Sequence, residues 1–129
     1  MHPAETYVGW AYNPATADCA DLVMQVQREM FGREISLPNG RPRGERGQAV
    51  LGARVRQLAT PTDTPADGDL VLMREPGESR ATHAGTYFHI QGEGWVLHAT
   101  DRLGGVGLLH RVRDLPSFGC FIQGFYQWA

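Results

Sequence analysis

The sequence contains no lysine, and all twelve of its basic residues are arginines. This absence excludes a phosphate-binding loop that relies on lysine, a Schiff-base lysine and a lysine general base. With fourteen acidic residues the formal net charge is -2 at pH 7. Since a nucleic-acid partner favours a basic protein, we expect no nucleic-acid binding.

Long hydrophobic runs are also missing. No uncharged apolar stretch approaches the ~20 residues that span a bilayer. The first residues, from Met1 to Glu5, lack the charged and apolar regions of a signal peptide. We therefore expect synthesis in the cytoplasm without a signal peptide, and no membrane insertion. The two cysteines, Cys19 and Cys120, are too few to staple a domain of this size, and a reducing compartment would keep both as thiols.

The chain has 129 residues, of which 42% are hydrophobic and 20% charged. This length fits one domain, residues 1–129, and the composition is that of a folded globular chain. The 16 glycines and 8 prolines predict many turns and short elements.

Helical patterns come first along the chain and strand patterns follow. A helix is predicted over residues 18–31, with Asp18 as N-cap and Gly32 after its end, and a weaker one over residues 45–58. The candidate strands are Asp69 to Met73, Thr82 to Ile90, Trp95 to Thr100, Val106 to Val112 and Phe118 to Trp128. This order predicts an α+β fold, in which two helices pack on a five-stranded antiparallel sheet.

The segment from Arg33 to Arg56 carries six arginines against two glutamates. Two interpretations remain open for this local positive charge. One is a solvated loop and helix face, and the other is a rim that attracts an anionic polymer.

Cys19 falls in the first turn of the predicted helix 18–31. The unpaired amides and the positive end of the helix dipole stabilise a thiolate there. Asp18 and Asp21 act in the opposite direction, so a nearby histidine would be needed to activate the thiol. Cys120 lies in the apolar run Phe118 to Ile122, which is typical of a structural cysteine.

Two histidines on neighbouring strands are candidate partners of this thiol. Alternation puts His83 on one face of its strand, and a turn at residues 92–94 would make the next strand, which carries His98, its antiparallel neighbour. One imidazole could then activate Cys19 and the other orient the first, if each pair lies within about 2.6–3.2 Å. His89 and His110 are interpreted as half-buried structural residues.

Four motifs resemble those of the NlpC/P60 cysteine peptidases, which cut peptidoglycan stem peptides. Residues 18–23, Asp-Cys-Ala-Asp-Leu-Val, resemble the Asp-Cys-Ser-Gly-Leu-Val nucleophile motif of the family. Residues 67–72 resemble its Pro-Gly-Asp-Leu-Val strand, residues 83–87 its His-Val-Gly-Ile-Tyr strand, and residues 96–100 the following strand with the third polar residue. The resemblance implies a papain-like fold for the whole chain.

The resemblance also implies roles for individual residues. Cys19 would be the nucleophile, His83 the general base and acid, and His98 the residue that orients the His83 ring. Tyr7 matches the tyrosine that lines the site ahead of the cysteine, with Tyr12 as a competitor for that role. The neighbours of Cys19 would lie against the substrate or the oxyanion; they are Asp18 and Ala20.

The implied function is a hydrolase that cleaves amide bonds of peptidoglycan stem peptides through a thioester, with no metal or other cofactor. The segment from Glu34 to Pro38 resembles the phage-tail branch of the family, which suggests phage tail proteins as partners; a secreted interbacterial toxin with an immunity protein is the other route.

Other classes of function also stay open. A zinc site could use Cys19, His83 and His98 with His89 or an aspartate. A noncatalytic tail or wall-binding module and a thiol amidase or acyltransferase are the remaining alternatives.

Overall fold

The computed structural model of the chain describes residues 2–13, 17–37, 53–78, 81, 83–100 and 103–129. Its centre is a six-stranded sheet in the order β1-β6-β2-β3-β4-β5, in which every neighbouring pair is antiparallel. The strands are β1 (Ala59–Thr62), β2 (Leu70–Arg74), β3 (His83–Ile90), β4 (Glu93–Thr100), β5 (Val106–Arg111) and β6 (Phe121–Trp128). The predicted α+β class with an antiparallel sheet is confirmed.

Helix α1 (Cys19–Phe31) matches the prediction closely. Its N-cap is Asp18, whose side chain accepts hydrogen bonds from two amides of the first turn, and its C-cap is Gly32 in the left-handed conformation at φ 66°. Leucine and valine side chains at helical spacing are buried; they are Leu22, Val23 and Val26. These signals are local in sequence, which is why the pattern was sufficient to place this helix.

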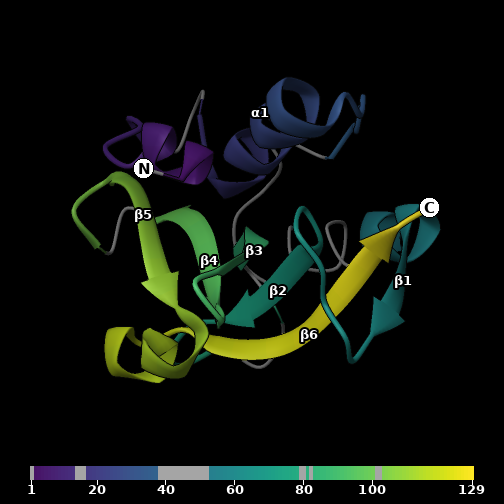
Figure 1. The fold of residues 1–129 in the computed structure, drawn as a ribbon. Coiled ribbons are helices and arrows are strands. Elements are labelled where there is room, and N and C mark those ends of the chain that lie inside the picture. The colour runs from purple at the N-terminus through teal and green to yellow at the C-terminus, as the bar shows by residue number, and fades with distance from the viewer. Residues whose placement is uncertain (1, 14–16, 38–52, 79–80, 82, 101–102) are drawn as a thin grey trace.

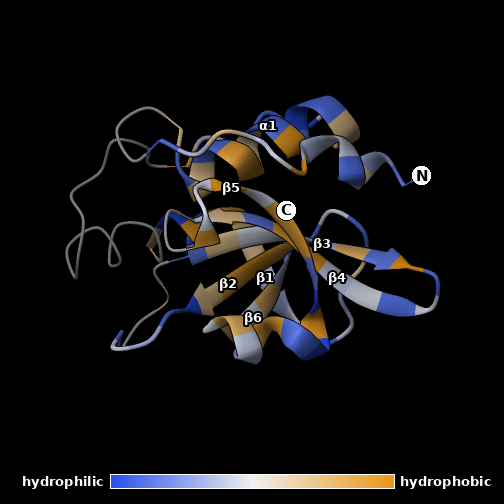
Figure 2. Ribbon diagram, turned by 90° about the vertical axis from the view of Figure 1, so that its left-hand side faces the viewer, coloured by the Kyte–Doolittle hydropathy of each residue, from blue (hydrophilic) through white to orange (hydrophobic). Residues whose placement is uncertain are grey.

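Helix α1 and the short 3-10 helix η1 (Pro3–Tyr7) lie together above the sheet in Figure 1. A second 3-10 helix, η3 (Val112–Phe118), lies at the far side of the sheet, next to the start of β6. The view turned by 90° in Figure 2 shows the same separation, with α1 above the strands. No helix in the part of the chain described by the structure is long and apolar enough to span a membrane.

The two faces of the sheet carry different core clusters. Side chains from the centre of the sheet that cluster with α1 residues are Leu70, Leu72, Ala84, Phe88, Leu97 and Ala99. The strand residues between them join a cluster without α1 residues, which includes Val71, Met73, Tyr87, Val96 and Cys120. Because side chains alternate along a strand, His83 and His98 share the face of Tyr87 and Val96.

The strand predictions were incomplete at one edge of the sheet. Residues 59–62 were not among the predicted strands, but they form β1 and pair with β6, so the sheet has six strands rather than five. Pro61 lacks an N–H group, and an edge strand with a single neighbour tolerates this loss. The prediction of a strand from Phe118 was also too long, because residues 112–118 form η3 and β6 begins at Phe121.

The second predicted helix, residues 45–58, is described only in part. Residues 53–58 are helical, as predicted, and residues 45–52 lie outside the described residues. The same holds for most of the arginine-rich segment between Arg33 and Arg56.

The turn between β3 and β4 is tighter than predicted. Ile90 pairs with Glu93, so the turn consists of Gln91 and Gly92 rather than residues 92–94. Both turn residues have positive φ, 52° and 79°, as a two-residue hairpin turn of the primed type requires. The resulting register brings the two histidine-bearing strands side by side, as the sequence predicted.

Candidate functional site

Cys19 is the first residue of α1 and is 4% exposed. Cys19 belongs to a core cluster that also contains Ala81, two residues before β3, and Ala84, the second residue of β3. The helix N-terminus stabilises a negative charge, so this position favours the thiolate form of a cysteine.

The two neighbours of Cys19 serve the helix start. The Asp18 carboxylate accepts hydrogen bonds from the Ala20 amide at 3.0 Å and from the Asp21 amide at 3.2 Å. The Asp21 carboxylate in turn accepts a hydrogen bond from the Asp18 amide at 2.8 Å, which completes a capping box. The Ala20 amide already donates its hydrogen bond to the Asp18 carboxylate. Asp18 and Ala20 therefore stabilise the helix that carries Cys19 instead of offering groups to an oxyanion.

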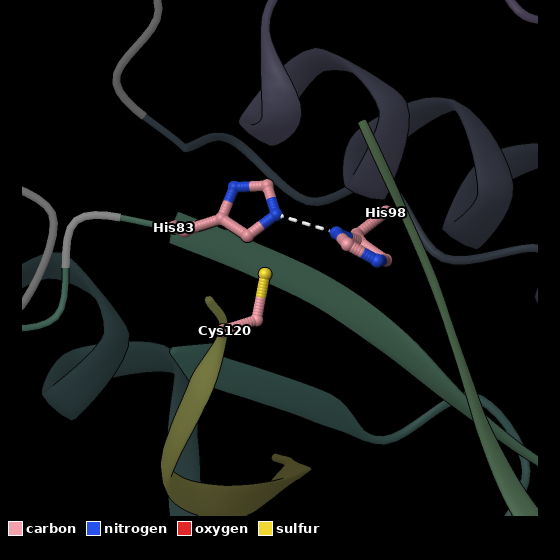
Figure 3. Close-up of side chains that lie close together, drawn as sticks. All are labelled: His83, His98 and Cys120. Atoms are coloured by element: carbon pink, nitrogen blue, oxygen red, sulfur yellow. Dashed lines mark hydrogen bonds between the residues drawn. The ribbon is translucent and has the colours of Figure 1, made fainter. Parts of the chain in front are cut away.

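His83 and His98 form a direct pair. The Nε2 atom of His83 lies 2.7 Å from Nδ1 of His98, and both residues are almost fully buried, at 2% and 1% exposed. Figure 3 shows the two rings side by side on β3 and β4. His83 begins β3 and His98 lies two residues from the end of β4, so the antiparallel register makes them diagonal neighbours.

A third histidine extends this pair. The Nε2 atom of His98 lies 2.9 Å from Nδ1 of His110 on β5. The His110 ring also stacks on Phe118 of η3, with 4.0 Å between the ring centroids and 10° between the planes. Burial lowers the pKa of His110 below its usual value, partly offset by Asp114, and so favours the neutral form of this imidazole.

Cys120 is the thiol that the structure places beside the histidines. Its Sγ atom and one nitrogen each of His83 and His98 lie within 4.8 Å of one another (Figure 3). Two ligands of a tetrahedral zinc ion, with bonds of about 2.0 Å, are about 3.3 Å apart. The 2.7 Å contact between the two imidazoles is shorter and has the length of a hydrogen bond. The geometry therefore fits two hydrogen-bonded imidazoles. A metal ion bound to both nitrogens would have to move the two rings apart.

Tyr7 lies elsewhere in the molecule. Its hydroxyl donates a 2.6 Å hydrogen bond to Glu29 in the second half of α1, ten residues beyond Cys19 and so about 15 Å further along the helix axis. Burial and this bond raise the pKa of Tyr7 to about 12. The structure therefore separates Tyr7 from Cys19, and the expectation that its hydroxyl lines the site is corrected. The competitor, Tyr12, bonds through its backbone amide to Gly105 next to β5.

Sequence reasoning missed the positions of His110 and Cys120. His110 on β5 pairs with Val96 on β4, two residues from His98. His110 therefore lies on the same face of the sheet as His98 and is its diagonal neighbour. Alternation along β5 was readable, but its register against β4 depends on the connection through residues 101–105, which the pattern left undefined. Cys120 joins the site from the position just before β6, far from His83 and His98 along the chain, and no local pattern signals such a contact.

A family model described as the NlpC/P60 family matches residues 5–113 of the chain. This match covers the end of η1, all of α1 and the strands that carry the three histidines. In comparisons with curated proteins and with solved structures, no match was found.

Proposed function

Because the chain belongs to the NlpC/P60 family, we propose that it is a cysteine hydrolase that cleaves amide bonds in peptidoglycan stem peptides. Members of this family are typically cysteine peptidases that act on peptidoglycan. The observation that carries the proposal is the 2.7 Å hydrogen bond between His83 and His98, on the two strands that match the family motifs. It supplies the base and the orienting residue of a thiol hydrolase.

The proposed reaction requires the His83 ring, which shares the sheet face of Met73 and Tyr87, to reach past the start of β3 to the Cys19 thiol in the cluster on the other face. His83 then takes the proton of the thiol and the sulfur attacks the amide carbonyl. The His83 nitrogen for this task is Nδ1, because Nε2 faces His98. The Cys19 backbone amide at the start of α1 is our candidate donor to the oxyanion. His83 then protonates the leaving amine, and water hydrolyses the thioester and regenerates the thiol.

Replacement of the two cysteines tests this proposal with a matched control. We expect Cys19→Ala to abolish the release of peptides from purified cell walls, while its circular dichroism spectrum stays that of the wild type. Cys120→Ser, which changes the other buried thiol, keeps measurable hydrolysis because its sulfur is not the nucleophile. Wild-type activity in Cys19→Ala would refute the mechanism.

A noncatalytic wall-binding module is the second candidate, and the burial of Cys19 favours it. Alkylation with iodoacetamide below about pH 7 distinguishes the two, since an activated thiolate reacts there and an inert buried thiol does not. Peptide mapping assigns the label to Cys19 or Cys120. Labelling of Cys19 alone supports the hydrolase, and no labelling of Cys19 supports the binding module.

We further propose that the protein acts on the bacterial cell wall as part of a phage or prophage tail. The segment from Glu34 to Pro38, which resembles the phage-tail branch of the family, supports this assignment. Co-purification with tail proteins is the expected result, whereas a tightly bound immunity protein would indicate an interbacterial toxin.

Assays on stem peptides and on acyl acceptors separate an endopeptidase from an amidase or acyltransferase.

A further inference from the structure

The two imidazole contacts form a continuous chain across three strands. His83 Nε2 lies 2.7 Å from His98 Nδ1, and His98 Nε2 lies 2.9 Å from His110 Nδ1. The strands are adjacent in the sheet, in the order β3-β4-β5. Each contact joins a nitrogen of one ring to the next ring, so the protonation of one ring constrains the others.

The proposed base function fixes the direction of this chain. If Nδ1 of His83 is to accept the thiol proton, Nε2 of His83 carries a proton and donates it to Nδ1 of His98. The neutral His98 ring then has its proton on Nε2, which donates to Nδ1 of His110. The His110 ring must therefore offer an unprotonated Nδ1 and carry its own proton on Nε2.

The surroundings of His110 suit an acceptor. Burial lowers the pKa of His110, which favours the neutral ring, in which one nitrogen is available to accept. Asp114 is the charged group of η3 that acts on His110, and its carboxylate is engaged by Nε of Arg111 at 2.7 Å. Stacking on Phe118 fixes the plane of the His110 ring.

The His98 ring is buried, with a residue exposure of 1%. A buried N–H group without an acceptor costs more than an ordinary hydrogen bond contributes. Loss of the acceptor on His110 would therefore favour another rotation or tautomer of the His98 ring, in which Nδ1 no longer accepts from His83.

Building on the proposed function, we propose that His110 is a positioning residue that holds His98, and through it His83, in the tautomer and orientation that the thiol reaction needs. In this chain of contacts the His98 ring lies between His110 and His83. His110 acts on the reaction only through His98.

Two substitutions at position 110 separate this role from simple packing. His110→Leu removes the acceptor, whereas His110→Asn keeps an amide oxygen near the position of Nδ1. We expect His110→Leu to lower kcat about 10- to 100-fold with little change in KM, and His110→Asn to recover most of this loss. His89→Leu, at an exposed position of β3, is the control and keeps wild-type kinetics.

Nitrogen NMR of the protein labelled with ¹⁵N-histidine reads the tautomers directly and does not depend on activity. The wild type is expected to show His98 protonated at Nε2 and His110 unprotonated at Nδ1, and His110→Leu to lose this pattern at His98. Protonation of His98 at Nδ1 in the wild type, or equal kcat in the Leu and Asn variants, would overturn the inference. A wild type that hydrolyses no substrate refutes the proposed function alone, and the spectra still test the bond between His98 and His110.

Discussion

His98 presents its Nδ1 atom to Nε2 of His83 at 2.7 Å from the neighbouring strand of an antiparallel pair. In the proposed mechanism this bond keeps the His83 ring turned so that its other nitrogen serves as the base. We expect His98→Leu to lower kcat/KM about 10²- to 10⁴-fold, since the base then loses its orienting partner. Hydrolysis of stem peptides measures the effect.

His98→Asn is the matched variant, because its amide oxygen lies near the position of Nδ1 and can accept from His83. A smaller loss than in His98→Leu is expected. If both variants lose the same activity, the acceptor at this position is not what matters, and the orienting role fails.

Gly85 on β3 pairs with His98 on β4. A Cβ atom at this position would lie 2.7 Å from Cγ1 of Val96 and 2.9 Å from the Leu97 carbonyl oxygen. Because the second contact is to backbone, Gly85→Ala should force β3 and β4 apart and destabilise the protein by about 1–3 kcal/mol. Urea denaturation measures this change.

The control for crowding is Gly124→Ala in β6. The three heavy atoms nearest to its added Cβ would all belong to the end of the Tyr126 ring, at 3.2 Å or more, and a side chain can move there. A loss of stability in Gly124→Ala as large as in Gly85→Ala would show that the Gly85 effect does not come from backbone crowding.

Tyr7→Phe should leave hydrolysis unchanged, because the Tyr7 hydroxyl is bonded to Glu29 at the far part of α1. The lost hydrogen bond is expected to lower the free energy of unfolding by about 0.5–1.5 kcal/mol near neutral pH. Glu29→Gln keeps an acceptor for the hydroxyl and should cost less than Glu29→Ala. A large loss of kcat in Tyr7→Phe would show that the Tyr7 hydroxyl takes part in the reaction.

The stability of the wild type relative to Tyr7→Phe should also depend on pH. The pKa of Tyr7 is raised to about 12 in the folded protein, above the value of about 10 in an unfolded chain. The folded state therefore holds this proton more tightly, and its contribution is complete below about pH 10 and lost as the pH rises towards 12. Unfolding curves of both proteins across this range measure the loss; a constant difference would contradict the assignment.

Chelation should change neither activity nor melting temperature. The two imidazoles grouped with Cys120 are hydrogen bonded to each other, with 2.7 Å between Nε2 of His83 and Nδ1 of His98. Purification without chelator, metal analysis and an assay before and after EDTA treatment measure the outcome. Stoichiometric zinc that is removed only with loss of the fold would favour the zinc site instead.

Local patterns in the sequence were enough for α1 and for the pairing of β3 with β4. Asp18 and Gly32 mark the ends of the helix through caps that involve residues within a few positions. The alternation around His83 and His98 assigned both to one face, and the actual turn at Gln91 and Gly92 preserves this parity. The edge strand β1 was missed because Pro61 and its neighbours have turn-like composition, and only pairing with β6 makes them a strand.

The sequence by itself determined the family motifs, the capped helix that carries Cys19, and the shared face of His83 and His98, because caps and alternation act over a few neighbouring residues. Only the tertiary structure decided that His110 and Cys120 lie beside His83 and His98. It also decided that the Tyr7 hydroxyl bonds to Glu29, away from these histidines. Strand register and the packing of β6 and η1 bring together residues far apart along the chain, and that depends on how the whole core packs rather than on any local pattern.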